Sequence, residues 1–120
     1  MAINKNDRIS YDIEVNEGET LPLLATAKDS AGAAITASEI SGVYVRIDDY
    51  HSDMAIKART AISSLTNPTS YTLSHSETMI VNSERDSEYR FVTFEYTYQG
   101  SNHLPEEYVV RVKNLRYHSV

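Results

Sequence analysis

Residues 91–98 read Phe-Val-Thr-Phe-Glu-Tyr-Thr-Tyr, and this stretch decides the fold class. It is a run of β-branched and aromatic residues broken by one glutamate, the composition that favours a pleated, half-buried strand. Residues 99–102 supply a turn, and the run Tyr-Val-Val-Arg-Val-Lys over residues 108–113 alternates again. The last third of the chain is therefore predicted to form a long β-hairpin.

The same period of two extends toward the N-terminus. Alternating apolar and polar residues predict four more strands with one buried and one solvated face, over residues 9–15, 21–27, 43–47 and 56–62. Pro22 lies near the start of its strand, a position that edge strands tolerate. A shorter strand is expected over 71–73, after the turn signal Asn67-Pro68, and residues 34–36 would add an eighth.

One segment departs from this period. Ser74-His75-Ser76-Glu77 matches a capping box, with serine at the cap and glutamate three residues later. A single helical turn is predicted near 75–81, closing over one end of the core. The hydrophilic run that follows ends this turn, and residues 83–88 are expected to form a polar surface loop.

The pattern predicts an all-β fold: an antiparallel β-sandwich of seven to eight strands with one short helical turn. A parallel sheet is disfavoured because its crossovers need helices that the sequence lacks. A closed barrel is the main alternative. We expect one sandwich domain over residues 8–115, an N-terminal arm over 1–7 and a C-terminal tail over 116–120.

Composition excludes several classes of protein. The 120 residues contain no cysteine, so disulfides, zinc-thiolate sites and iron–sulfur clusters are ruled out. Seventeen acidic against 11 basic residues give a net charge of −6, which argues against binding to nucleic acid. The longest mostly apolar stretch, residues 21–27, is far shorter than the roughly 18 apolar residues of a membrane span. No signal peptide is visible at the N-terminus.

The sequence offers little catalytic chemistry. Its histidines lie on four different segments, outside the spacings typical of metal or catalytic motifs: His51, His75, His103 and His118. The four glycines each stand alone at a predicted turn, so no phosphate-binding loop is present. We therefore expect a protein that is not an enzyme and that needs no cofactor.

The segment 48–53 is the best candidate for a metal site. Asp49, His51 and Asp53 lie at every second position and could direct two carboxylates and a ring nitrogen toward one cation. The structural alternative is a solvated strand end with turn-forming residues. That alternative is favoured because calcium loops usually supply more oxygen ligands than this segment offers.

Nine tyrosines are the most unusual part of the composition. Four are expected on core faces: Tyr11, Tyr71, Tyr96 and Tyr108. The other five are expected on outward positions or near loops, and with two apolar residues of the terminal segments they form a candidate interface: Tyr44, Tyr50, Tyr89, Tyr98, Tyr117, Leu115 and Ile3. Tyrosine is common in half-buried strands, and it is also enriched in protein–protein interfaces.

Several segments together resemble the small immunoglobulin-like modules of tailed-bacteriophage structural proteins. Residues 17–23 (Glu-Gly-Glu-Thr-Leu-Pro-Leu), 28–36 and 40–47 match the first half of those modules, and residues 71–78 and 88–100 match the second. Where those modules usually carry a glycine before the tyrosine of the penultimate strand, this sequence has Ser87-Glu88, so a different turn is expected there.

The resemblance implies an immunoglobulin-like sandwich and a non-enzymatic structural protein of a virion, assembled in the host bacterial cytoplasm. A capsid decoration (cement) protein is the leading expectation. A neck, tail or baseplate adaptor, or a tail-fibre module that binds carbohydrate or a receptor, is the alternative. The implied partners are other capsid or tail subunits in a multi-copy or homo-oligomeric assembly, with no direct contact to nucleic acid or membrane.

Overall fold

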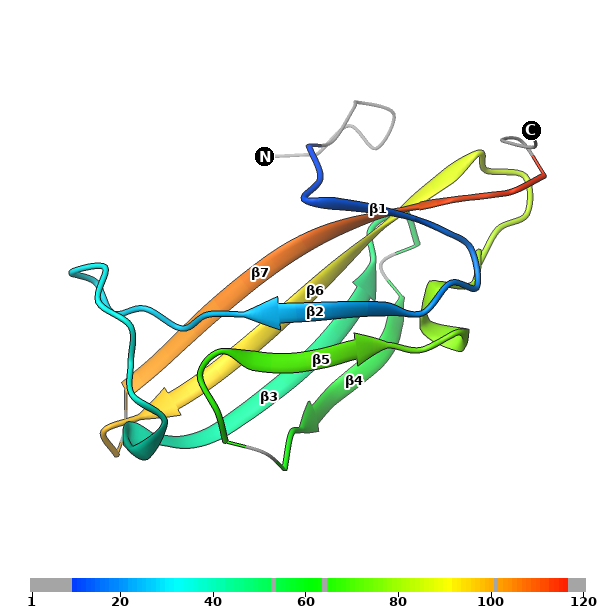
Figure 1. The fold of residues 1–120 in the computed structure, drawn as a ribbon. Coiled ribbons are helices and arrows are strands. Elements are labelled where there is room, and N and C mark those ends of the chain that lie inside the picture. The colour runs from blue at the N-terminus through cyan, green and yellow to red at the C-terminus, as the bar shows by residue number, and fades with distance from the viewer. Residues whose placement is uncertain (1–9, 53, 64, 101, 117–120) are drawn as a thin grey trace.

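Two β-sheets face each other in the computed structural model, which describes residues 10–52, 54–63, 65–100 and 102–116 (Figure 1). The described residues form seven strands: β1 (Ile13–Asn16), β2 (Leu21–Ala25), β3 (Ile40–Asp49), β4 (Ala55–Ala61), β5 (Thr69–Leu73), β6 (Ser87–Tyr98) and β7 (Asn102–Lys113). Two single-turn 3₁₀ helices complete them, η1 (Ala37–Glu39) and η2 (Ser76–Thr78). The predicted all-β class is confirmed.

The larger sheet has the strand order β1-β7-β6-β3-β4, and the smaller one pairs β2 with β5. All neighbours are antiparallel except β1 and β7, which run parallel, so the expectation of a purely antiparallel fold is wrong at this pair. A short hairpin forces two strands to pair antiparallel, but β1 and β7 are far apart in sequence and can pair in either direction. The parallel register places Ile13 opposite Val110 and Val15 opposite Val112, which extends the apolar inner face to the edge of the sheet.

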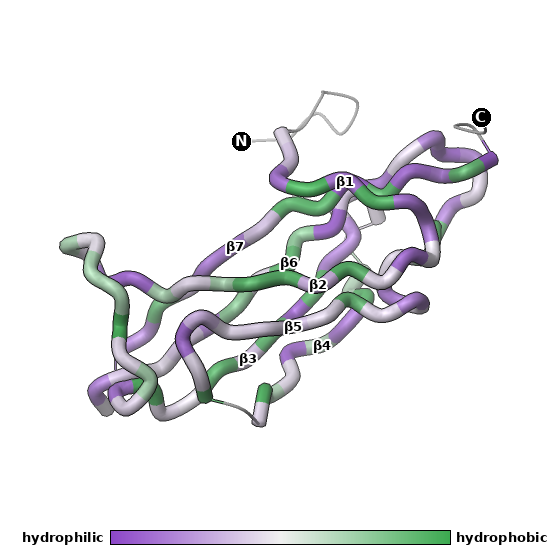
Figure 2. The backbone as a smooth tube through the Cα atoms, viewed as in Figure 1, coloured by the Kyte–Doolittle hydropathy of each residue, from purple (hydrophilic) through white to green (hydrophobic). Residues whose placement is uncertain are grey.

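The core lies between the sheets. Alternate residues of each strand point inward, which produces the alternating hydropathy along the chain in Figure 2. The inner rows of β3 and β6 are the centre, with Ile47, Val92, Phe94 and Tyr96 fully buried. The rings of Phe94 and Tyr108 meet edge to face at 5.9 Å between centroids. The core roles predicted for Tyr96 and Tyr108 are thus confirmed, although Tyr108 is only partly buried.

Several strand boundaries differ from prediction. β6 begins at Ser87, and residues 87–90 pair in register with β7 although they are polar. Residues 10–12 precede β1 and are not a strand, and residues 34–36 contribute only an isolated bridge between Lys28 and Ala34. Hydropathy therefore located the strands but did not predict the first four residues of β6, because two of them, Glu88 and Arg90, are charged.

The predicted helical turn is confirmed as η2, shorter than expected. The capping box forms: the Ser74 amide donates to Glu77 Oε1 at 2.8 Å, and the Glu77 amide donates to Ser74 Oγ at 3.4 Å. The Tyr71 hydroxyl also donates to the Glu77 carboxylate, at 2.8 Å from Oε2. Burial, and secondly this hydrogen bond, raise the pKa of Tyr71 well above its ordinary value.

This shift predicts a loss of stability in alkali. Above the ordinary tyrosine pKa of about 10 the unfolded chain releases the Tyr71 proton while the folded chain retains it, so the free energy of unfolding falls as pH rises. Tyr71→Phe is expected to make this decline shallower, as measured by urea unfolding at several pH values from neutral to alkaline. An equally steep decline in the variant would contradict the assignment.

Candidate functional site

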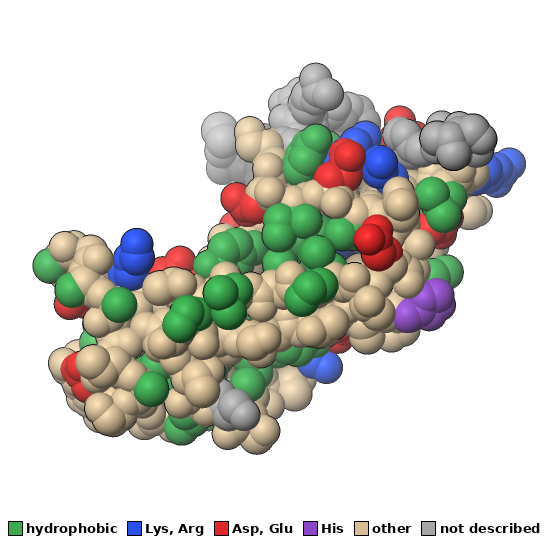
Figure 3. Space-filling model, in the orientation of Figure 1, with side chains coloured by type: hydrophobic (Ala, Val, Ile, Leu, Met, Phe, Trp, Pro, Cys, Tyr) green, Lys and Arg blue, Asp and Glu red, His purple; other side chains and the backbone are tan. Residues whose placement is uncertain are grey.

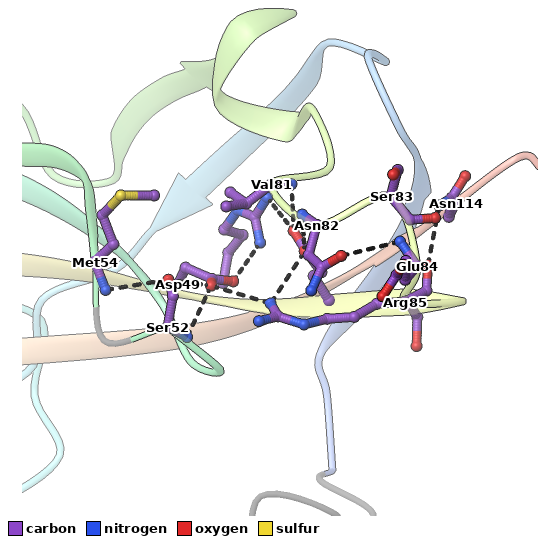
Figure 4. A network of polar contacts seen from close by, with 12 residues as sticks. Asp49, Ser52, Met54, Val81, Asn82, Ser83, Glu84, Arg85 and Asn114 are labelled. Atoms are coloured by element: carbon purple, nitrogen blue, oxygen red, sulfur yellow. Dashed lines mark hydrogen bonds and ion pairs between the residues drawn. The ribbon is translucent and has the colours of Figure 1, made fainter.

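Asp49, from the candidate metal segment, ends β3 on its inner face and is 1% exposed. Its Oδ1 accepts a hydrogen bond from Arg90 Nη1 at 2.8 Å, and its Oδ2 accepts from the amide and the hydroxyl of Ser52 at 3.0 and 2.5 Å (Figure 4). The expected solvated strand end is therefore wrong for Asp49. Arg90 is its register partner on β6, and both side chains point into the core.

A second buried carboxylate, Glu88, lies on the other side of Arg90. Its Oε1 accepts from Arg90 Nη2 at 2.9 Å and from the Val81 amide at 2.8 Å. Its Oε2 accepts from the Asn82 amide at 2.8 Å and from Arg85 Nη1 at 3.1 Å. The expectation that residues 83–88 form a surface loop is wrong for Glu88, which is fully buried in β6.

These four side chains form a charge-balanced cluster, the buried ion network, of Asp49, Arg85, Glu88 and Arg90. Figure 4 labels Asp49 and Arg85 within it. Arg85 covers it from the loop before β6, with its Nη1 3.4 Å from Asp49 Oδ2. Asn114 holds that loop by donating to the Ser83 and Arg85 carbonyls at 3.1 and 2.9 Å. Each carboxylate is already bonded to cations and backbone amides, so the network joins loops and offers no free base for catalysis.

The same network bears on the metal hypothesis. The carboxylate of Asp49 is bonded to Arg90 and Ser52, and the His51 ring packs 5.2 Å from that of Tyr50. Asp53 lies outside the described residues. Within residues 10–52, 54–63, 65–100 and 102–116, no group of three or more acidic or histidine side chains is placed to hold a metal ion.

The candidate interface tyrosines occupy different environments. Tyr50 and Tyr89 lie on the outer face of the five-stranded sheet but are only 6% and 8% exposed, because they pack in an aromatic cluster with His51 and Phe91. Tyr11, expected in the core, is instead 43% exposed, with its ring 6.4 Å from that of Tyr89. The alternation of residues 9–15 predicted that Tyr11 points inward, but β1 begins only at Ile13, so Tyr11 lies outside the strand.

The remaining candidates are divided between the core, the surface and the undescribed ends. Tyr98, expected on an outward position or near a loop, is the last residue of β6 and is partly buried against the core, because it shares the inward parity of Tyr96. Tyr44 points outward, and Leu115 is 44% exposed near the end of the described chain. Tyr117 and Ile3 lie outside the described residues, as do most of the predicted arm and tail.

The outer face of the five-stranded sheet carries a layer of paired charges that the sequence analysis did not anticipate. Arg59 of β4 is bonded to Glu95 of β6 at 2.5 Å, and its guanidinium carbon lies 3.6 Å from the centre of the Tyr44 ring. Nearby, Arg46 is bonded to Asp48 at 2.9 Å. The signal was available for Tyr44, Arg46, Asp48 and Glu95, because they share the outward parity of β3 and β6, whose inner rows are buried.

The layer continues to the other edge of the sheet. Glu14 of β1 is bonded to Arg111 and lies 3.6 Å from the Lys113 ammonium. The hydrogen bond from Arg111 is the largest cause that lowers the pKa of Glu14 below its ordinary value, and the positive charges of Arg111 and Lys113 act in the same direction. The outer face thus carries tyrosine, arginine and acidic side chains that hold one another in position.

Comparisons with known proteins assign no relative to this chain. No family model, curated protein or solved structure matches it. In the part of the chain that the structure describes, no helix is long and apolar enough to cross a membrane.

Proposed function

We propose that this protein is a non-enzymatic structural module of a tailed-bacteriophage virion, and specifically a capsid decoration (cement) protein that docks on neighbouring subunits. The observation that carries the docking role is the outer face of the five-stranded sheet, with its Arg59–Tyr44 stack and its ordered ion pairs. The virion assignment rests on the sequence resemblance.

The strand order supports the immunoglobulin-like part of this proposal. In immunoglobulin domains the third, sixth and seventh strands share one sheet, and the second and fifth share the other. Here β3, β6 and β7 lie in the larger sheet, while β2 and β5 form the smaller one. The first and fourth strands depart from the constant-type pattern, because β1 and β4 lie in the larger sheet. The cysteine pair and tryptophan typical of antibody domains have no counterpart, since the chain contains neither residue type.

A pair of charge-reversing variants tests the outer face. Arg59→Glu is expected to abolish incorporation into particles, because it removes the cation from the Tyr44 ring and places a carboxylate against Glu95. Lys28→Glu makes the same charge change at an exposed residue after β2 and is expected to incorporate normally. The readout is quantitative mass spectrometry of purified phage particles assembled with each tagged variant.

Equal incorporation of both variants would contradict docking through this face. The copy number of the wild-type chain in the same particles tests its location. A number that matches the capsid lattice supports a decoration protein, whereas a number that matches the ring symmetry of a neck, tail or baseplate would place it there instead.

A tail-fibre module that binds carbohydrate is the second candidate, favoured by one observation. Tyr11 exposes 43% of its surface beside the aromatic cluster and has the Arg111 guanidinium 5.8 Å from its ring centre. An exposed aromatic ring beside a cation is a surface on which a sugar can stack. Binding on a glycan array that Tyr11→Ala abolishes would favour this function over decoration.

A further inference from the structure

The smaller sheet leaves part of the larger one uncovered. Two strands face five, and β2 lies on the side of β1 and β7 while β5 lies on the side of β4 (Figure 1). We call the surface formed by the free edge of β2 and the half-buried inner-row residues of β7, Leu104, Glu106 and Tyr108, the seam. In Figure 3 hydrophobic side chains gather over β2 and between it and β1. The seam is therefore an apolar surface at the side of the sandwich.

The inner row of β7 lines this seam. Buried Val110 and Val112 continue into Leu104, Glu106 and Tyr108, and all three of these side chains are only half-buried. Leu104 and Tyr108 pack against the core and remain partly exposed. The row thus presents the order apolar, acidic, apolar at alternate positions of one strand.

Glu106 is the unusual member of the row. Its register partner is the fully buried Phe94, and its negative charge acts on the hydroxyl of Tyr96, so the carboxylate lies over the core. Within the part of the chain that the structure describes, no cation or hydrogen-bond donor pairs with it. A half-buried carboxylate among apolar groups loses hydration and gains no partner in return, so a cation supplied from outside would be favoured there.

The second wall of the seam is a strand edge. β2 pairs only with β5 among the described strands, so its other edge has backbone groups free to bond. Pro22 has no N–H to donate, so an added strand would bond mainly along Leu23 to Ala25. Leu24, at 65% the most exposed large apolar side chain described, projects from this same strand.

We propose that the seam binds an extended segment of another protein with an apolar residue, a lysine or arginine and a second apolar residue at alternate positions. The segment adds a third strand to the smaller sheet at the free edge of β2. Its inward side chains then match the row of β7: apolar groups on Leu104 and Tyr108, and the cation on Glu106. The order apolar, basic, apolar is the complement of the order that β7 presents.

Two synthetic peptides test this with the full chain. Acetyl-Thr-Val-Thr-Lys-Thr-Val-Thr-amide carries the proposed pattern, and its twin has Glu in place of Lys. The Lys peptide is expected to bind and the Glu peptide to bind at least about tenfold more weakly, as measured by fluorescence anisotropy of labelled peptides. Chemical-shift changes in the amides of β2 and β7 locate the bound peptide.

A matched pair of variants separates the seam from the other side of the same strand. Glu106→Lys is expected to lose the Lys peptide and to gain the Glu peptide, whereas Glu107→Lys, one residue on and facing outward, keeps the wild-type preference. If Glu106→Lys does not fold, Glu106→Gln tests the same point, because it removes the charge and leaves the side-chain size almost unchanged. The Glu106→Gln variant is expected to bind the Lys peptide and the Glu peptide equally.

Equal effects of Glu106→Lys and Glu107→Lys, or no discrimination between the peptides, would overturn the proposal. A dimer in sedimentation equilibrium that Glu106→Lys abolishes and Glu107→Lys preserves would also overturn it, by assigning the seam to a second copy of the chain. The seam and the outer face lie on opposite sides of the larger sheet. Failure here therefore leaves the proposed docking through the outer face intact, and incorporation of Arg59→Glu tests that independently.

Discussion

Arg90→Met is expected to lower the free energy of unfolding by about 3–5 kcal/mol, the largest effect of any charged residue that the structure describes. Methionine fills a similar volume, but it leaves Asp49 and Glu88 buried side by side without the guanidinium that lies between them. It also removes the donor to the Met79 carbonyl, now at 2.6 Å. Urea denaturation monitored by tyrosine fluorescence measures the change.

Arg46→Met is the matched control, since it makes the same substitution at an arginine bonded to an aspartate. The Arg46 side chain is 51% exposed, so water replaces the lost partner of Asp48. Its expected cost is about 0–1 kcal/mol, as for other surface ion pairs. If the two variants lost similar stability, burial would not be what makes the network important, and the assignment of Arg90 would fail.

Asn67→Ala is expected to cost about 2–4 kcal/mol through the loss of three hydrogen bonds. The Asn67 side chain accepts from the Ala27 amide at 3.0 Å and donates to the carbonyls of Ala27 and Ile35 at 2.9 and 2.5 Å. Ala27 and Ile35 are buried, so water does not readily replace the amide. Besides lower stability in urea, the variant is expected to exchange the Ala27 amide hydrogen faster.

Asn102→Ala provides the comparison for that variant. Asn102 is exposed, and its side chain makes a long contact of 3.4 Å to Gln99. We expect a change within about 0.5 kcal/mol, as at other surface positions. A comparable loss in both variants would mean that the amide of Asn67 does not fasten the segment after β2 to the loop before β5.

The sequence predicted the sandwich because its signal is periodic and apolar. Each of the seven strands overlaps a segment predicted from its sequence pattern, and the capping box of Ser74 and Glu77 forms as its spacing indicates. What alternation cannot supply is the direction in which two strands distant in sequence pair. The parallel register of β1 and β7 depends on a tertiary contact, in which Ile13 and Val15 align with Val110 and Val112.

The buried ion network was missed for a different reason. Glu88, Arg90 and Asp49 are charged, and hydropathy assigns charged residues to the surface. The parity of β6 held the missing signal, because Val92, Phe94 and Tyr96 point inward and the same alternation carried backward places Arg90 and Glu88 on that face. Ser87-Glu88, which stands where the phage modules usually carry a glycine before the tyrosine, was a second indication that this segment differs from theirs. The ion pair between Asp49 and Arg90 joins two strands that are distant in sequence, so the pattern within either strand alone does not predict it.

The parallel pairing of β1 with β7 also determines how the sandwich responds to tension. One strand is near the beginning of the chain and the other near its end, and they run side by side in the same direction. A pull applied to the two ends therefore draws the strands past each other along their length. The cross-strand bonds, and the contacts of Glu14 with Arg111 and Lys113, are then loaded together and not one after another. A module joined to neighbours at both ends would resist extension through this short edge before its core opens.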